Sequence, residues 1–112
     1  MPRGYAAYLA DIMQAIERIE AYTKDRTLAD LSGDTKTQDA LIKNLLVIGE
    51  AVKGLPQEVK EKAKDVPWDG IAGLRDRLGH QYFDINMQIV WDFVKNELPL
   101  LKLAAERLKA ES

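Results

Sequence analysis

The strongest constraint on this chain is the spacing of its apolar residues, which recur at steps of three and four along almost its whole length. That spacing places apolar side chains on one face of an α-helix, whereas a half-buried strand alternates apolar and polar residues. The sequence contains no sustained alternation and no Asn-Gly hairpin turn. It therefore predicts an all-α protein.

Breaks between the apolar stripes predict the first two main helices. The first ends before the polar stretch 30–33, and its stripe consists of Tyr5, Tyr8, Leu9, Ile12, Ile16 and Ile19. Asp34 or Thr35 then offers an N-cap for the second helix. That helix stops at Gly54-Leu55-Pro56, in the usual order of Gly before Pro. Its stripe consists of Leu41, Leu45, Ile48, Ala51 and Val52.

A short charged helix and two further main helices are predicted in the second half. The short helix runs from Pro56 through Lys64, and Pro67 ends it. The third main helix begins at Trp68-Asp69 with Asp69 as its cap, buries Ile71, Leu74 and Leu78, and ends around 79–83. Asp84 caps the last helix, which kinks at Pro99 and carries the stripe Ile89, Val90, Phe93, Val94, Leu100, Leu103 and Leu108. Short loops favour antiparallel neighbours.

Composition limits the chemistry available to this chain. A length of 112 residues predicts a single domain spanning 1–112. Because the chain has no cysteine, disulfides, thiolate nucleophiles, zinc fingers and iron–sulfur clusters are excluded. One histidine and the lack of a calcium-loop pattern indicate that there is no metal site, and no cofactor motif is present. All imidazole chemistry must therefore use His80.

Charge and hydropathy limit the kinds of partner that this chain can bind. The net charge of −2 disfavours a simple basic surface for DNA, but it permits an enzyme that meets RNA at a small local site. No apolar stretch approaches the roughly 20 residues of a membrane span, and no targeting signal is visible. The sequence thus predicts a soluble, cytoplasmic protein.

Chemically active side chains gather in segment 74–83. Asp76 and His80 are four residues apart, so on a helix the carboxylate can orient the imidazole and favour its charged form. Arg75 can border the same cleft if the last helical turn loosens at Gly79. An arginine fork suits phosphate, and histidine titrates near neutral pH. Together they suit cleavage of a phosphodiester without a metal.

The same residues also allow a purely structural interpretation. In it, His80 ends a helix or packs at its edge, and Tyr82 is an aromatic at the edge of the core whose hydroxyl reaches water. Arg75 and Arg77 are then surface charges, Arg77 the more so of the two. Spacing alone leaves this alternative open.

The segment also resembles a known family. Arg75-x4-His80-x-Tyr82 is similar to the R-x4-H-x-Y motif of the HEPN superfamily, specifically the HepT-like (DUF86) ribonuclease toxins of prokaryotic toxin–antitoxin modules. Further similar blocks stand in the family's order and span nearly the whole chain: 11–12 with 19–23, 37–40 with 48–51, 66–74, and 90–91 with 98–99.

The resemblance implies an antiparallel HEPN-like helical bundle that dimerises, so that two motifs face each other across a shared cleft. Arg75 and His80 would be the ribonuclease residues. Asp76 stands where the family commonly has Asn, so a supporting role in orienting His80 is expected for it. The implied partner is a minimal nucleotidyltransferase antitoxin, which silences the toxin by adding AMP to the motif tyrosine, here Tyr82.

Three functions follow from these observations. The first is a metal-independent RNA endonuclease that acts as the toxin of a type VII system. The second is a HEPN-type binding module that docks to or regulates a nucleotidyltransferase and cleaves nothing; the negative net charge and Asp76 favour it. The third is a helical homodimer in which the motif helix is only an interface. The sequence favours the first.

Overall fold

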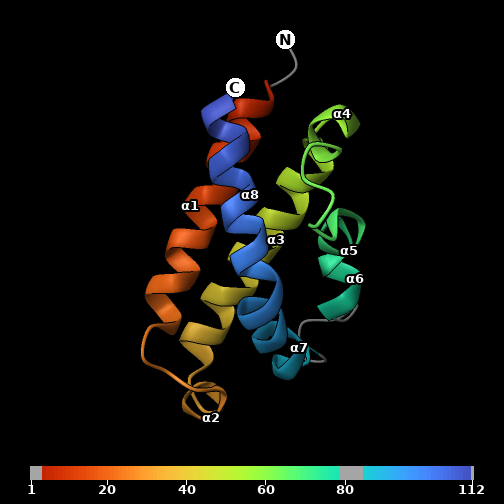
Figure 1. Cartoon of the computed structure of the whole chain (residues 1–112). Helices are drawn as coiled ribbons and strands as arrows, with labels where there is room; N and C mark the ends of the chain where they lie inside the picture. The colour runs from red at the N-terminus through yellow and green to blue at the C-terminus, as the bar shows by residue number, and fades with distance from the viewer. Residues whose placement is uncertain (1–3, 79–84, 112) are drawn as a thin grey trace.

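The computed structural model describes residues 4–78 and 85–111, and within them the chain is helical and contains no strand (Figure 1). The predicted all-α class is confirmed there. In chain order the elements are α1 (Tyr5–Thr23), α2 (Leu28–Leu31), α3 (Thr35–Gly54), α4 (Gln57–Lys60), α5 (Trp68–Ala72), α6 (Leu74–Leu78), α7 (Met87–Asp92), the π-helical turn η2 (Phe93–Glu97) and α8 (Leu98–Glu111).

The bundle is built around α3, which packs against α1 on one side and against α5 and α6 on the other. α8 lies beside α1, with the start of α1 and the end of α8 at the same end of the bundle (Figure 1). α1 and α3 bury the apolar stripes predicted for the first two helices, except that Tyr5 and Tyr8 at the start of α1 are half-buried. Fully buried members of this core include Leu9, Ile12, Ile16, Ile19, Leu41, Leu45, Ile48, Phe93 and Leu101.

Side-chain hydrogen bonds among Arg26, Asp34 and Thr37 join the segment after α1 to the start of α3. Asp34 caps α3, as predicted, by accepting a hydrogen bond from the Thr37 backbone N–H at 3.1 Å. Its second carboxylate oxygen accepts from the Thr37 hydroxyl at 2.6 Å and from Arg26 at 2.8 Å. These bonds, with the Thr37 hydroxyl first, lower the pKa of Asp34 to about 2. The connection between α1 and α3 is therefore ordered by charge-assisted bonds.

Several predicted helix boundaries are wrong. α1 ends at Thr23, and α2 follows as a separate turn with its own capping box between Thr27 and Asp30. α4 ends at Lys60 and not at Lys64. The following turn is held by the Trp68 indole, whose Nε1 donates to the carbonyls of Lys60 and Ala63 at 3.1 and 2.9 Å.

The third predicted helix is divided. Gly73 ends α5 and α6 starts directly after it, while Asp69 lies in the first turn of α5, whose N-cap is Pro67. Asp69 is therefore not the predicted cap. Ile71, Leu74 and Leu78 are buried as expected. The predicted end of this helix at 79–83 lies outside the described residues.

The last helix differs from its prediction at both its start and its register. Asn86 caps α7 by accepting a bond from the Gln88 N–H at 2.9 Å, and the predicted cap at Asp84 lies outside the described residues. In η2 the Leu98 N–H bonds to the carbonyl of Phe93, five residues back, just before Pro99, which has no N–H to offer.

The wider π-helical turn changes which face of α8 packs against the core. One residue more in a turn rotates the following helix by about 100°, so the spacing drawn through the predicted stripe no longer holds. Leu103 is 67% exposed and Leu100 is also exposed, although both were predicted to be buried. The buried positions of α8 are instead Leu98, Leu101, Ala104, Ala105 and Leu108.

Gly49 sets how closely α5 and α6 approach α3. A Cβ atom placed on it would lie 3.2 Å from the carbonyl oxygen of Ile71 and 3.7 Å from the Cβ of Leu74. The first distance is to backbone, which cannot rotate away. Glycine therefore allows the segment that carries Arg75 to lie directly against the central helix.

We expect Gly49→Val to separate α5 and α6 from α3 and to lower the free energy of unfolding by about 1–3 kcal/mol, the usual cost of overpacking a core. Urea denaturation measures this. Ala10→Val, at an exposed position of α1, is the matched control and should change stability by less than about 0.7 kcal/mol. A Gly49→Val protein as stable as the parent would show that the contact is not tight.

Candidate functional site

The two arginines of α6 lie in different surroundings. The Arg77 guanidinium is half-buried and forms a two-pronged ion pair with Glu97 at the end of η2: Nη1 donates to Oε1 at 3.0 Å and Nη2 to Oε2 at 2.7 Å. Nη1 also donates to the backbone carbonyl of Gly70 in α5 at 3.4 Å. Arg77 thus connects α5, α6 and η2.

This pairing assigns Arg77 a structural role. The hydrogen bonds to Glu97 raise the pKa of the guanidinium, and the carboxylate compensates its charge within the protein. The interpretation of Arg77 as a surface charge is wrong, because its partner lies twenty residues away on another helix. No spacing rule links positions that far apart, and the π-helical turn that places Glu97 has no signal in the sequence other than Pro99.

Arg75 and Asp76 are exposed on α6. Neither side chain forms a hydrogen bond or ion pair with another residue of the described ranges 4–78 and 85–111. An arginine held on a short helix without a carboxylate partner is free to bind an anion, and its planar fork matches two phosphate oxygens. Of the α6 arginines, Arg75 is therefore the one available for a phosphate ligand.

His80 and Tyr82 lie outside the described residues, as does Gly79. The predicted contact of Asp76 with His80, and the cleft that Arg75 and His80 would share, therefore stay predictions. What the structure places is the start of the motif: α6 runs from Leu74 to Leu78, buries Leu74 and Leu78, and presents Arg75 and Asp76 to solvent.

Comparison with known proteins matches nearly the whole chain. The family described as Ribonuclease HepT-like matches residues 12–108. The chain is 40% identical over 109 residues to the "Probable ribonuclease HepT" of Thermococcus cleftensis, covering 97% of this chain and 99% of that protein. It is 48% identical over 93 residues to the "Putative RNase MJ0127" of Methanocaldococcus jannaschii, covering 83% and 77%. No solved structure matches the chain.

The unequal surroundings of the two arginines predict unequal effects on stability. Arg77→Ala removes a bidentate pair and leaves Glu97 without its partner, so the free energy of unfolding should fall by about 1–2 kcal/mol, given that the pair is partly exposed. Arg75→Ala should change it by less than about 0.5 kcal/mol, as an unbonded surface substitution does. Urea denaturation of both variants measures the difference, and equal losses would contradict the assignment.

Proposed function

Because this chain belongs to the HepT-like ribonuclease family, we propose that it is an RNA endonuclease whose active site uses Arg75 and His80. The proposal rests on the different surroundings of the two arginines of α6. Glu97 takes up the charge of Arg77, whereas Arg75 is exposed and has no carboxylate partner among the described residues. Arg75 is the residue that occupies the arginine position of the R-x4-H-x-Y pattern.

RNA supplies its own nucleophile for this reaction. The 2′-hydroxyl attacks the adjacent phosphorus, the bond to the 5′-oxygen breaks, and a 2′,3′-cyclic phosphate and a 5′-hydroxyl remain. One histidine takes the proton from the 2′-hydroxyl and another gives a proton to the leaving 5′-oxygen. The Arg75 guanidinium stabilises the charge that develops on the phosphate oxygens. These groups are sufficient for the reaction without a metal ion.

The histidine count points to a site shared by two chains. One chain has a single histidine, and one imidazole cannot be base and acid in the same step. A homodimer provides two copies of His80 and two of Arg75. It also gathers positive charge in one cleft, although each chain has a net charge of −2.

Asp76 has a supporting role in this proposal. A carboxylate one helical turn before His80 would hold the imidazole by one ring nitrogen and stabilise its protonated form. The same negative charge would repel a phosphate that approached it directly. Asp76 is therefore assigned to the side of His80 that faces away from the RNA.

The biological role proposed is that of a cytoplasmic toxin. A nuclease that cleaves RNA in the cell needs to be controlled, and the resemblance of Arg75-x4-His80-x-Tyr82 to the type VII toxins supports control by a minimal nucleotidyltransferase. Adenylylation of Tyr82 would place a bulky anion two residues from His80. That anion would occupy the position of the substrate phosphate and repel RNA.

We expect Arg75→Ala to reduce the rate of RNA cleavage by about 10²–10³-fold, the usual effect of removing a group that stabilises transition-state charge. His80→Ala should reduce it by about 10²–10⁴-fold through loss of proton transfer. The assay uses an end-labelled RNA in the presence of EDTA, with a 2′-deoxy oligonucleotide of the same sequence, which should not be cut.

Arg18→Ala is the matched control, because Arg18 is an exposed arginine of α1 outside the motif. It should cleave RNA as fast as the parent. If Arg75→Ala and His80→Ala also do so, the assigned residues are wrong. If the parent cleaves no RNA at any protein concentration but forms a stable complex with the product of an adjacent nucleotidyltransferase gene, the chain is the binding module and not the enzyme.

Incubation with the cognate nucleotidyltransferase and ATP should add AMP to Tyr82 and abolish RNA cleavage. Peptide mass spectrometry locates the label. Tyr82→Phe, which keeps the ring and removes the acceptor hydroxyl, should stay unlabelled and should continue to cleave RNA in the presence of the transferase. A label on another residue, or labelling that leaves cleavage unchanged, would contradict the proposed control.

A further inference from the structure

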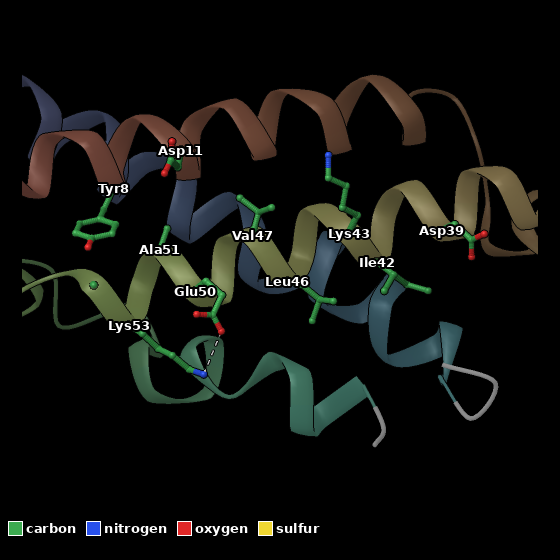
Figure 2. A pocket seen from close by; sticks show the side chains of 11 residues that line it. Tyr8, Asp11, Asp39, Ile42, Lys43, Leu46, Val47, Glu50, Ala51 and Lys53 are labelled. Atoms are coloured by element: carbon green, nitrogen blue, oxygen red, sulfur yellow. Dashed lines mark hydrogen bonds and ion pairs between the residues drawn. The ribbon is translucent and has the colours of Figure 1, made fainter. Parts of the chain in front are cut away.

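The helix that carries the exposed Arg75, α6, is too short to hold its own orientation. Five residues close too few hydrogen bonds to form a stable helix in isolation, so α6 depends on the elements around it. In Figure 2, α6 runs alongside α3, and its buried Leu74 lies against Gly49 of that helix. The groove drawn in the same figure is lined by residues of α1 and α3 and gives α6 no support. Contact with α3 thus fixes one side of α6.

A second support reaches α6 through Arg77. Both oxygens of the Glu97 carboxylate accept from the Arg77 guanidinium, at 3.0 and 2.7 Å, and Nη1 of Arg77 also donates to the carbonyl of Gly70 at 3.4 Å. The Arg77 and Glu97 side chains are 35% and 21% exposed, so salt screens this pair less than a pair on the open surface. Residues two apart leave a helix about 200° from each other. Anchoring Arg77 therefore opposes rotation of α6 and keeps Arg75 directed to the solvent.

Glu97 reaches Arg77 from a π-helical turn. In η2 the Leu98 N–H bonds to the carbonyl of Phe93, five residues back, whereas an α-helix uses the carbonyl four residues back. The additional residue changes the direction in which the following side chains leave the helix by up to about 100°. Phe93 and Leu98 remain buried, and Glu97 is paired with α6. Turns of this kind are rare and are frequently found at functional sites.

We propose that Glu97 is a positioning residue for RNA cleavage, which acts through Arg77 to hold α6 and with it Arg75. This inference rests on the proposed function, because it concerns the geometry in which Arg75 meets the phosphate. Glu97 itself needs no contact with RNA, since both its oxygens accept from the guanidinium. A displacement of about 1 Å in a reacting site is enough to lower the rate by about 10²-fold. A variant that releases α6 should therefore cleave slowly even when it is fully folded.

Glu97→Gln tests the role directly, because it keeps the shape of the side chain and replaces one acceptor oxygen by an NH₂ group that cannot accept from Arg77. Under conditions in which circular dichroism shows every variant to be folded, kcat and kcat/KM for an end-labelled RNA should fall together by about 10–100-fold. KM should change little, because Arg75 acts on the charge that develops in the transition state. A lower urea midpoint with an unchanged kcat would show a role in stability alone and overturn the inference.

Two control variants separate positioning from a general loss of charge or stability. Glu20→Gln breaks another pair between helices, in which both carboxylate oxygens accept from Lys102 of α8, at 3.1 and 2.9 Å. Ile12→Val removes a buried methyl group from α1 and should lower the urea midpoint without changing any charge. Both should keep the kcat of the parent. If either loses as much kcat as Glu97→Gln does, the effect is general and the inference is wrong.

A double-variant cycle tests whether the effect passes through Arg77. Arg77→Met keeps an unbranched side chain and removes the guanidinium. Because each single substitution breaks the same pair, the double variant Glu97→Gln/Arg77→Met should have about the kcat of the slower single variant. Losses that multiply in the double variant would show that the two residues act independently, and would overturn the route through Arg77.

Comparison with Arg75→Ala separates this inference from the proposed function. If Arg75→Ala loses cleavage and Glu97→Gln keeps the kcat of the parent, the proposed function stands and the positioning role is wrong. If Arg75→Ala cleaves as fast as the parent, or the parent cleaves no RNA, the proposed function is wrong and the positioning role is overturned with it. Loss of kcat in both variants, with the parent kcat in Glu20→Gln, supports the two together.

Discussion

The approach of α5 and α6 to α3 at Gly49 is the contact on which the motif depends. Because Gly49 has no side chain, the backbone of α5 approaches α3 so closely that a Cβ atom on residue 49 would lie only 3.2 Å from the carbonyl oxygen of Ile71. Leu74 and Leu78 then bury into the core, which turns the other face of α6, with Arg75 and Asp76, to the solvent. The exposure of the candidate catalytic arginine is thus a consequence of how closely a neighbouring helix packs.

The pair between Arg77 and Glu97 completes this arrangement from the other side. α6 has only five residues and could not hold its position by its own hydrogen bonds. A bidentate ion pair to η2 and a bond to the carbonyl of Gly70 connect it to two further elements. Two arginines two residues apart therefore have different surroundings: Arg77 fixes the helix, and Arg75 is exposed to solvent.

The fold could largely be predicted from the sequence, because long helices reveal themselves through the spacing of their apolar residues. The stripes of α1 and α3, the cap at Asp34 and the burial of Leu74 and Leu78 depend on local spacing and were predicted. The π-helical turn was not predicted, because it depends on how Leu98 and Pro99 fit the bundle. As a result, Leu100 and Leu103 lie at the surface and not in the core.

The site was predictable to a smaller extent. Arg75 and Asp76 could be selected because they belong to a compact local pattern, and their exposure agrees with that selection. The role of Arg77 depends on Glu97, twenty residues away, so only the three-dimensional arrangement reveals it.

The central claim is that two chains share one active site, and the most direct measurement is the rate of RNA cleavage by mixed dimers. Parent and His80→Ala chains are denatured together and refolded in varying proportions at constant total concentration. If each site needs His80 from both chains, the rate follows the square of the parent fraction, so an equal mixture keeps about one quarter of the full rate. A rate that falls in direct proportion to the parent fraction would contradict the account.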